Sequence, residues 1–432
     1  MHIAPTLIGR LAPVLASAVV LAALGCREEA ESPMAPEAEP AIAATAATAL
    51  TFRQVSAGGH HSCGVTTDNQ AFCWGEGAVG ELGDGTETSS SIPVPVAGDL
   101  RFLRVNAGES YTCGVTTDNR AYCWGDNSFG QLGDGTHFRR LTPVPVAGGH
   151  RFPWVDAGLR HTCGVTTDHR VFCWGDNFSG QLGNGTNTGP EICPVLDSPC
   201  STKPLAVVGG RDFRNVSAGS GHTCGVKTND RAFCWGDNSE GQLGSGVASK
   251  IPIRVAIARR FRVVRAGGTH SCGLTTGDRV YCWGAGEVGQ LGNATETSSS
   301  TPVRVLAGGR VFSGLSADDR YTCGVTPDSR AFCWGINNGG QLGRGTITGP
   351  EQCAPAEIPC STRPVAVVGG LQLRQADAGL GHTCGVTTDN RAFCWGLNSS
   401  GQLGNGTNTG PESCGEFAPC SSRPVAVAAP RP

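Results

Sequence analysis

The sequence has little charge and almost no helical periodicity. Charged residues make up 16% of the 432 positions, and the formal net charge is −3 without any concentrated basic tract. Because nucleic-acid binding needs a concentrated positive face, we expect no nucleic-acid partner. Outside the N-terminal leader no stretch has a helical pattern, and the 64 glycines suit tight turns between short strands. These features predict an all-β protein.

A repeat accounts for most of the chain. The string Cys-Trp-Gly occurs seven times, and each time another Cys lies ten residues before its Cys. One unit contains strand-like segments at 102–108, 111–116 and 121–125, and a proline-containing segment at 143–146. Prolines remove backbone donors, so the fourth segment should lie at a sheet edge. Seven such units predict a seven-bladed β-propeller of four-stranded antiparallel blades over residues 51–428.

The two ends of the repeat region suggest how the ring closes. The first unit opens at Phe52 without a preceding Pro-Val strand, and the last ends with Pro424–Val427. The connection between a Pro-Val segment and the next unit is short, which suits a hairpin within one blade. We therefore expect 424–427 to pair with 52–57 and seal the ring, leaving 429–432 as a disordered tail.

The paired cysteines of each unit predict disulfides. Residues facing each other across antiparallel strands have Cα atoms about 4.5–5.5 Å apart, which a disulfide can bridge. The alternative is seven pairs of buried thiols, but the export signal described below favours oxidation. The sequence contains no C-x2-C motif, so we expect no zinc site and no cofactor. The expected hairpin pairs are Cys63/Cys73, Cys113/Cys123, Cys163/Cys173, Cys224/Cys234, Cys272/Cys282, Cys323/Cys333 and Cys384/Cys394.

Units three, six and seven each carry an insertion with two further cysteines. The expected pairs are Cys193 with Cys200, Cys353 with Cys360, and Cys414 with Cys420. All three insertions follow the Trp-Gly strand, so they should project from the same side of the disc. They either brace long loops or form a stiff rim that contacts a partner, because a stapled loop loses less entropy on binding. The candidate partner-binding residues are Glu191, Lys203, Glu351, Arg363, Glu412 and Arg423, together with Trp154, which lies outside the repeat pattern.

Repeated aromatic and histidine positions are interpreted as scaffold. Five units have a histidine before the Ser/Thr-Cys pair, whereas Tyr111 and Tyr321 fill this slot in the other two. A slot that accepts either ring suits one structural hydrogen bond better than a metal ligand, and the seven repeated tryptophans suit blade packing. No isolated nucleophile–base set or phosphate loop is present, so we expect no catalytic residues. The five histidines are His61, His161, His222, His270 and His382.

The unit from His161 to Gly183 resembles the repeats of the regulator-of-chromosome-condensation family. The shared features are the His-Thr start, the Asp-containing turn, the aromatic-x-Trp-Gly strand end and the Gly-Gln-Leu-Gly loop, and units of this pattern follow one another in register seven times between residues 52 and 427. The resemblance implies a closed seven-bladed propeller. The family includes nuclear members that exchange nucleotide on a small GTPase and exported bacterial propellers that bind a protein across one face. In its expected location this sequence is more similar to the exported group, and the resemblance specifies no partner.

The N-terminus predicts export. An apolar run at 11–24 follows Arg10 and suits a signal peptide over 1–25. The run ends Ala-Leu-Gly before Cys26, which resembles a bacterial lipobox, with Ala23 in place of the usual Leu. Cys26 is also the one cysteine left unpaired, so we expect it to be lipidated. Residues 26–50, rich in Ala, Glu and Pro, predict a disordered tether to an outer membrane or cell surface.

Two functions fit these features. The first is a monomeric, non-catalytic exported scaffold, anchored to the membrane by its lipid alone, that binds or adheres to a protein through one propeller face. The alternative is a carbohydrate-binding or carbohydrate-active propeller with a site at the central channel. Three or more carboxylates or histidines converging in the channel would favour the alternative.

Overall fold

A computed structural model describes residues 50–354, 357–414 and 418–430. The described residues all belong to one compact unit of the chain. The expected signal peptide, the lipidation site at Cys26 and nearly all of the tether lie outside the described residues. Within the described ranges, no helix has the length and apolar character needed to cross a membrane.

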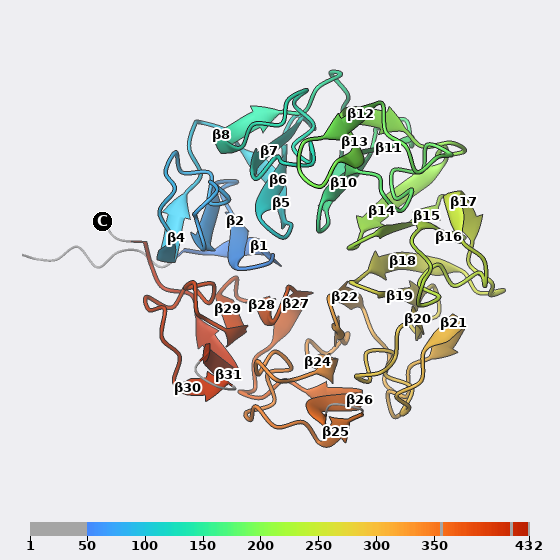
Figure 1. Ribbon diagram of the computed structural model, residues 1–432. Coiled ribbons are helices and arrows are strands. Elements are labelled where there is room, and N and C mark those ends of the chain that lie inside the picture. Colours follow the sequence, from blue (N-terminus) through green and yellow to red (C-terminus); the bar gives the residue numbers. More distant parts are fainter. Residues whose placement is uncertain (1–49, 355–356, 415–417, 431–432) are drawn as a thin grey trace, which may run out of the picture. The chain divides into compact units, whose positions relative to one another are not determined.

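Seven antiparallel sheets form a ring around a central channel, which confirms the predicted all-β propeller (Figure 1). The innermost strands are β1 (Phe52–Ala57), β5 (Phe102–Ala107), β9 (Trp154–Ala157), β14 (Phe213–Ala218), β18 (Phe261–Ala266), β22 (Gly314–Asp318) and β27 (Leu373–Ala378). The second strands are β2 (His61–Thr66), β6 (Tyr111–Thr116), β10 (His161–Val165), β15 (His222–Lys227), β19 (His270–Thr275), β23 (Tyr321–Val325) and β28 (His382–Thr387). The third strands are β3 (Ala71–Gly75), β7 (Ala121–Gly125), β11 (Val171–Asp176), β16 (Ala232–Gly236), β20 (Val280–Gly284), β24 (Ala331–Ile336) and β29 (Ala392–Leu397).

The fourth strands complete the blades, and three blades have a fifth. The fourth strands are β4 (Ser90–Pro95), β8 (Arg140–Pro145), β13 (Ser198–Ala206), β17 (Ser249–Arg254), β21 (Ser299–Arg304), β26 (Ile358–Ala366) and β31 (Ala418–Ala426). The additional strands are β12 (Glu191–Cys193), β25 (Glu351–Cys353) and β30 (Glu412–Cys414), each of which pairs with the fourth strand at the outer edge of its blade. The insertions in units three, six and seven therefore form hairpins on the rim (Figure 1).

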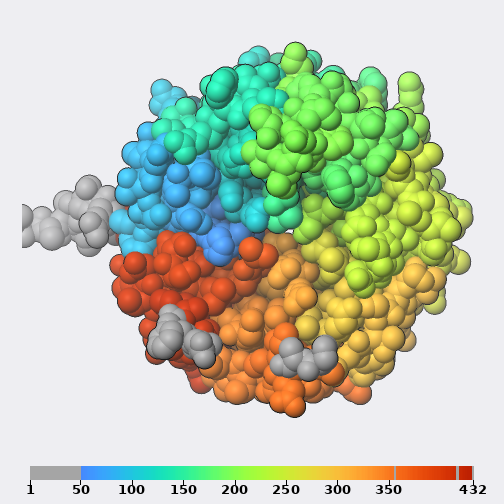
Figure 2. All heavy atoms as spheres, in the orientation of Figure 1, coloured from blue at the N-terminus to red at the C-terminus, as the bar shows by residue number. Residues whose placement is uncertain are grey.

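The predicted ring closure is wrong. Strand β1 pairs with β2 alone, and β31 pairs with β29 and β30, so the two chain ends share no sheet. The reason is that each blade is made of consecutive strands, and the short connection that suggested a hairpin instead crosses to the channel edge of the next blade. The first and last blades meet by packing, as the blue and red segments in Figure 2 show. The Arg374 guanidinium spans this junction and donates to the Phe52 and Arg53 carbonyls at 2.9 and 2.8 Å.

The hydrophobic core consists of seven main clusters, each placed between neighbouring blades. The tryptophan of every Cys-Trp-Gly string is fully buried in such a cluster. Its indole N–H donates to a main-chain carbonyl of the preceding blade, as from Trp174 to Gln131 at 2.8 Å. Gly133 allows this close approach: its φ is 71°, and a Cβ there would lie 2.6 Å from the Trp174 Nε1. The predicted packing role of these tryptophans is therefore confirmed.

A second contact joins the blades at the histidine slot. The His61 Nε2 lies 2.8 Å from the Thr112 hydroxyl of the next blade, and this hydroxyl donates to the Glu81 carbonyl at 3.0 Å. The same arrangement closes the ring, where the His382 Nε2 lies 2.8 Å from the Ser62 hydroxyl. The equivalent histidine contacts elsewhere are His161 to Thr223, His222 to Ser271 and His270 to Thr322, at 2.8–2.9 Å.

Seven disulfides join the hairpin cysteine pairs that the spacing predicts. In every pair the two cysteines face each other across the second and third strands, as Cys163 faces Cys173 with Cα atoms 4.1 Å apart. This separation is slightly shorter than the range expected from sequence, and the predicted pairing is confirmed. The hairpin disulfides are Cys63–Cys73, Cys113–Cys123, Cys163–Cys173, Cys224–Cys234, Cys272–Cys282, Cys323–Cys333 and Cys384–Cys394.

Three further disulfides staple the rim hairpins, and they too match the pairs expected from sequence. Each joins two cysteines of the same insertion, whose Cα atoms lie 5.8–5.9 Å apart. Each also links the short fifth strand to the fourth strand beside it, so the staple closes the hairpin across its two strands. The rim disulfides are Cys193–Cys200, Cys353–Cys360 and Cys414–Cys420.

Replacing Ser62 by Ala tests the ring junction. The change removes the acceptor for the His382 N–H and one donor to the Gln402 carbonyl, and leaves buried polar groups unpaired. We expect a loss of about 1–3 kcal/mol in unfolding free energy, measured by guanidinium titration. Ser62→Thr is the control, because threonine fills this position in most blades and should retain stability. Equal stability of Ser62→Ala and the parent would contradict the assigned role.

Candidate functional site

The rim hairpins and the turns between first and second strands lie at the same end of the propeller. Each hairpin interrupts the connection from the third to the fourth strand, which leaves the blade at the end where the first strand turns into the second. We call this end the loop face. It carries the mouth of the central channel and all three stapled hairpins.

Three of the charged candidates brace their own hairpins. The Glu191 carboxylate accepts a hydrogen bond from the Thr202 hydroxyl at 2.9 Å. The carboxylates of Glu351 and Glu412 each accept one from the main-chain N–H of the facing strand, at 2.7 and 2.9 Å. The basic candidates are instead exposed to solvent, and they are Lys203, Arg363 and Arg423. The three acidic candidates are therefore already hydrogen-bonded within their own hairpins.

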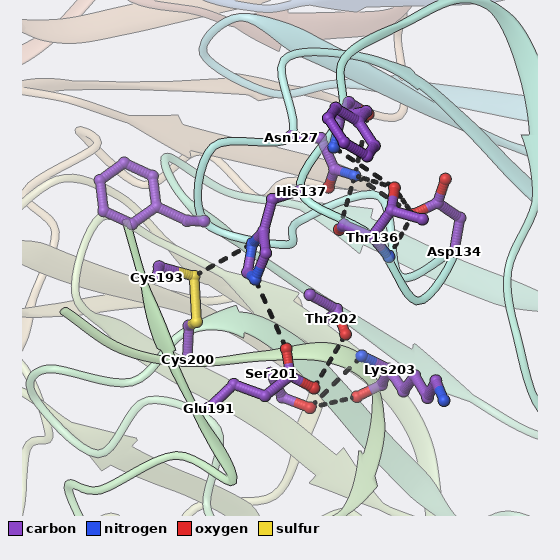
Figure 3. Close-up of polar contacts among 12 residues, drawn as sticks. Asn127, Asp134, Thr136, His137, Glu191, Cys193, Cys200, Ser201, Thr202 and Lys203 are labelled. Atoms are coloured by element: carbon purple, nitrogen blue, oxygen red, sulfur yellow. Dashed lines mark hydrogen bonds and ion pairs between the residues drawn. A yellow bond between two sulfur atoms is a disulfide. The ribbon is translucent and has the colours of Figure 1, made fainter. Parts of the chain in front are cut away.

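His137 packs against the first rim hairpin (Figure 3). Its Nδ1 lies 3.6 Å from the Cys193 sulfur, and its Nε2 lies 3.6 Å from a Glu191 carboxylate oxygen. Cys193 is bonded to Cys200, so neither sulfur is a thiolate. A zinc site with two thiolates therefore does not exist in this oxidised state. The contact fixes the loop of the second blade beside the hairpin of the third.

Large apolar side chains are exposed around this same hairpin. Leu196 at its tip is 74% exposed, Ile192 is 60% exposed, and Phe138, next to His137, is 73% exposed. We call these three residues the hairpin patch. The sequence-based reasoning named only charged residues of the insertion and missed them. The available signal was the Pro-Val-Leu sequence between Cys193 and Cys200, which the other two insertions lack.

A cavity of about 350 Å³ occupies the central channel. The innermost strands have one edge without a strand partner, so its N–H and C=O groups need other partners. Side chains of the preceding blade provide them: the Ser56 hydroxyl accepts from the Ala107 N–H at 3.1 Å, and Gln54 both accepts from the Val105 N–H and donates to its carbonyl. Polar channel residues thus hold neighbouring blades together.

Trp154 lies in this channel, not on the outer surface. It is half-buried, and its indole N–H donates to the Val216 carbonyl at 2.9 Å. The guanidinium carbons of Arg104 and Arg265 lie 4.6 and 5.3 Å from the centre of its ring. The sequence marked Trp154 as a candidate partner-binding residue but did not indicate that it lies in the channel, which depends on the alternation of strand β9.

Four aspartates line the channel cavity, namely Asp156, Asp318, Asp319 and Asp377. Asp156 and Asp377 accept from main-chain N–H groups of the next blade at 2.9 and 3.1 Å, as serines do elsewhere in the ring. Asp318 replaces a glycine that every other blade has at this position. Burial raises the pKa of Asp318 to about 8, aided by the neighbouring carboxylates. Burial also raises the pKa of the other three.

The histidine slot is structural. Each of the five histidines is fully buried, and burial lowers the pKa to about 3, or about 4 for His222. The facing hydroxyl has one proton, which it donates to a carbonyl of the preceding blade. It must therefore accept from the histidine, so the ring is a neutral imidazole with its proton on Nε2. These rings are not available as metal ligands or proton carriers.

The fold and its repeated contacts define a class, the disulfide-stapled seven-bladed propeller with Trp-Gly and Gly-Gln-Leu-Gly repeats. A family model for the RCC1-like domain matches residues 20–374. Models for the regulator of chromosome condensation (RCC1) repeat match residues 374–402 and 389–431. The chain belongs to the RCC1-like family.

Similar proteins are functionally diverse. The human probable E3 ubiquitin-protein ligase HERC6 is 30% identical over 189 residues, which cover 44% of this chain and 13% of HERC6. The Arabidopsis thaliana ultraviolet-B receptor UVR8 is 30% identical over 201 residues, which cover 45% of this chain and 43% of UVR8. The matches thus span less than half of either relative. The Saccharomyces cerevisiae Prp20p structure shares the fold with a TM-score of 0.70 at 18% identity, covering 84% of this chain and 87% of Prp20p.

Replacing His222 by Tyr tests the protonation state of the slot. A histidine that is neutral in the fold takes a proton only on unfolding, so it lowers stability as the pH falls below about 6.5. At pH 5 this amounts to about 2 kcal/mol for one histidine. Tyrosine fills the slot in two blades and gains no proton there.

We expect the parent to lose about 2 kcal/mol more unfolding free energy than His222→Tyr between pH 8 and pH 5. Urea or guanidinium titration at both pH values measures this difference. The buried aspartates act in the opposite direction, because their raised pKa values stabilise the fold on acidification, but they cancel in the comparison. Identical pH dependence in the two proteins would mean that His222 is already protonated in the fold.

Proposed function

We propose that the protein is an exported, non-catalytic binding scaffold that holds a protein partner on its loop face. The observation that carries this proposal is the hairpin patch: three large apolar side chains stand exposed on and beside a rim element stapled by a disulfide. Propellers of this family bind protein partners, since Prp20p was characterised by its binding to Gsp1p and histones and yeast RCC1 was solved with Kap60. The identity of those partners is not transferred to this chain.

The geometry of the hairpin suits an anchor. Leu196 and Asp197 have φ values of 61° and 46°, a left-handed conformation that is uncommon for leucine. The Cys193–Cys200 disulfide and the pairing of β12 with β13 hold this tip in place. A pre-formed apolar anchor loses little entropy when a partner covers it. Lys203, exposed on the same hairpin, would contribute to the polar border of the interface.

The disulfides indicate the kind of compartment in which the protein is found. Ten disulfides in one chain indicate an oxidising environment. We further propose that Cys26 carries the lipid anchor and that residues 26–50 act as the tether, which would place a monomeric propeller at the cell envelope. The leader ending in Ala-Leu-Gly-Cys and the unpaired twenty-first cysteine support this step.

A second candidate function is favoured by the channel. Three or more carboxylates in the channel would favour a carbohydrate-binding or carbohydrate-active site, and the channel cavity is lined by four aspartates. Trp154 supplies an aromatic surface beside them. Two of the four, Asp156 and Asp377, already serve as main-chain acceptors, which reduces the weight of this observation. The channel is therefore a second binding site to be tested separately from the loop face.

Replacing Leu196 by Asp tests the hairpin patch. Full-length tagged protein, exposed to an envelope extract of its own cells, should retain at least about tenfold less partner after this change, because an apolar anchor contributes about 2 kcal/mol or more. Leu306→Asp is the control: Leu306 is 46% exposed but follows strand β21 at the opposite end of the blade. Equal retention by both variants, measured by quantitative mass spectrometry, would argue against the loop-face site.

Replacing Cys26 by Ser tests the lipid anchor. A lipidated Cys26 would carry the two or more acyl chains that stable anchoring needs. The parent should therefore incorporate labelled palmitate and fractionate with membranes. The variant should lose the label and appear in the soluble fraction with its propeller folded. Membrane association that persists in Cys26→Ser would require another anchor.

A further inference from the structure

Three channel residues depart from the seven-blade pattern and meet at one place. Arg104 occupies the position filled by Gln54 and Gln375 in other blades, and Arg265 occupies the position of Ser56 and its equivalents. Both guanidinium groups lie over the ring of Trp154, at 4.6 and 5.3 Å from its centre. The other blades have no cation at either position and carry only neutral or acidic residues there, so the two cations require a separate explanation.

Arg104 lacks the partners that its counterparts have. Gln54 and Gln375 hydrogen-bond the main chain of the next blade. The Nε of Arg104 is instead buried without a hydrogen-bond partner among the described residues. Arg265 donates through Nε to the Leu315 carbonyl at 3.1 Å, which leaves its outer nitrogens for another acceptor. Buried guanidinium donors without acceptors are costly, and a bound ligand would satisfy them.

The charge around Arg104 is positive. Burial lowers the pKa of Arg104, and the charges of Arg265 and Arg53 lower it further. The charge of Arg265 acts to lower the pKa values of Asp156 and Asp377, although burial raises them overall. Glu109 and the four aspartates line the same cavity, but within the described ranges none of them forms an ion pair with Arg104. The Arg104 side of the cavity therefore presents donors and positive charge to a ligand.

We propose that the channel cavity binds a small polyhydroxylated molecule carrying an oxyanion, namely a sugar acid or a sugar phosphate, with the oxyanion held by Arg104 and Arg265. The planar guanidinium fork matches a carboxylate or phosphate edge. A volume of about 350 Å³ suits a ligand of this size. This inference rests on the second candidate function, the channel site, and is independent of the loop face.

Titration of the full-length protein with small sugars tests the proposal. The probes are glucuronate, glucose 6-phosphate and neutral glucose at pH 7, followed by calorimetry and tryptophan fluorescence. Fluorescence is informative because Trp154 is half-buried in the channel, whereas the seven repeated tryptophans are fully buried. We expect at least one anionic probe to bind and glucose to bind at least tenfold more weakly.

Variants locate the binding. Arg104→Gln and Arg265→Ser install residues that other blades use at these positions, so both should fold, as checked by circular dichroism. Each should weaken anion binding about tenfold or more, since a charged hydrogen bond contributes about 1.5–3 kcal/mol. Arg330→Gln is the matched control, because it removes an exposed arginine paired with Asp328 on a turn outside the channel.

The outcomes separate this inference from the function on which it rests. Preference for glucuronate or for glucose 6-phosphate identifies the carboxylate or the phosphate as the recognised group. Equal binding of glucose would retain a carbohydrate site and overturn the oxyanion. Binding that is unchanged in both channel variants would also overturn the assignment. Absence of binding to all three probes and to a glycan array would end both the inference and the second candidate function.

Discussion

One hydroxyl group per blade determines how this ring is held together. The Ser or Thr before each hairpin cysteine donates its proton to a carbonyl of the preceding blade, as Thr223 does to Gln181. The same carbonyl accepts the indole N–H of Trp235, so two buried side chains of one blade bind one atom of its neighbour. The hydroxyl oxygen then has only lone pairs left. At the five junctions where a slot histidine of the preceding blade faces this hydroxyl, the histidine must donate a proton to it. The burial and the tautomer of the slot histidines and the spacing of neighbouring blades all depend on this arrangement of hydrogen bonds.

The repeated contacts also leave few residues free for function. The tryptophans, the slot histidines and most polar channel residues are occupied by neighbouring blades. What remains differs between blades: the apolar tip at Leu196, the cations Arg104 and Arg265 beside Trp154, and the buried carboxyl of Asp318. These differences lie in two separate parts of the propeller, the rim and the channel, which are therefore the two candidate sites.

The periodic features of the structure could be predicted from the sequence. The features that depend on how the ring closes in three dimensions could not. Seven Cys-Trp-Gly strings were enough for the blade count and the disulfides, because each depends on contacts within one repeat. The ring junction was wrong because the length of a connection does not reveal whether it turns back or crosses to the next blade. Glu191 looked free in sequence but braces its own hairpin, since this depends on the register of β12 against β13. The hairpin patch was missed because exposure of Leu196 is a property of the turn, not of the residue.

Because the ring closes without strand exchange between its first and last blades, each blade can fold from its own segment of the chain. Every blade is a contiguous piece of chain, and the seven hairpin disulfides each close a separation of only ten residues. A blade is thus complete, with its cross-link, once its own segment has folded, and no cysteine has to wait for a distant partner. The junction between the first and last blades uses the same kinds of contact as the other six. Linking residue 430 to residue 50 and opening the ring at another inter-blade connection would therefore preserve every sheet and every disulfide of the described propeller.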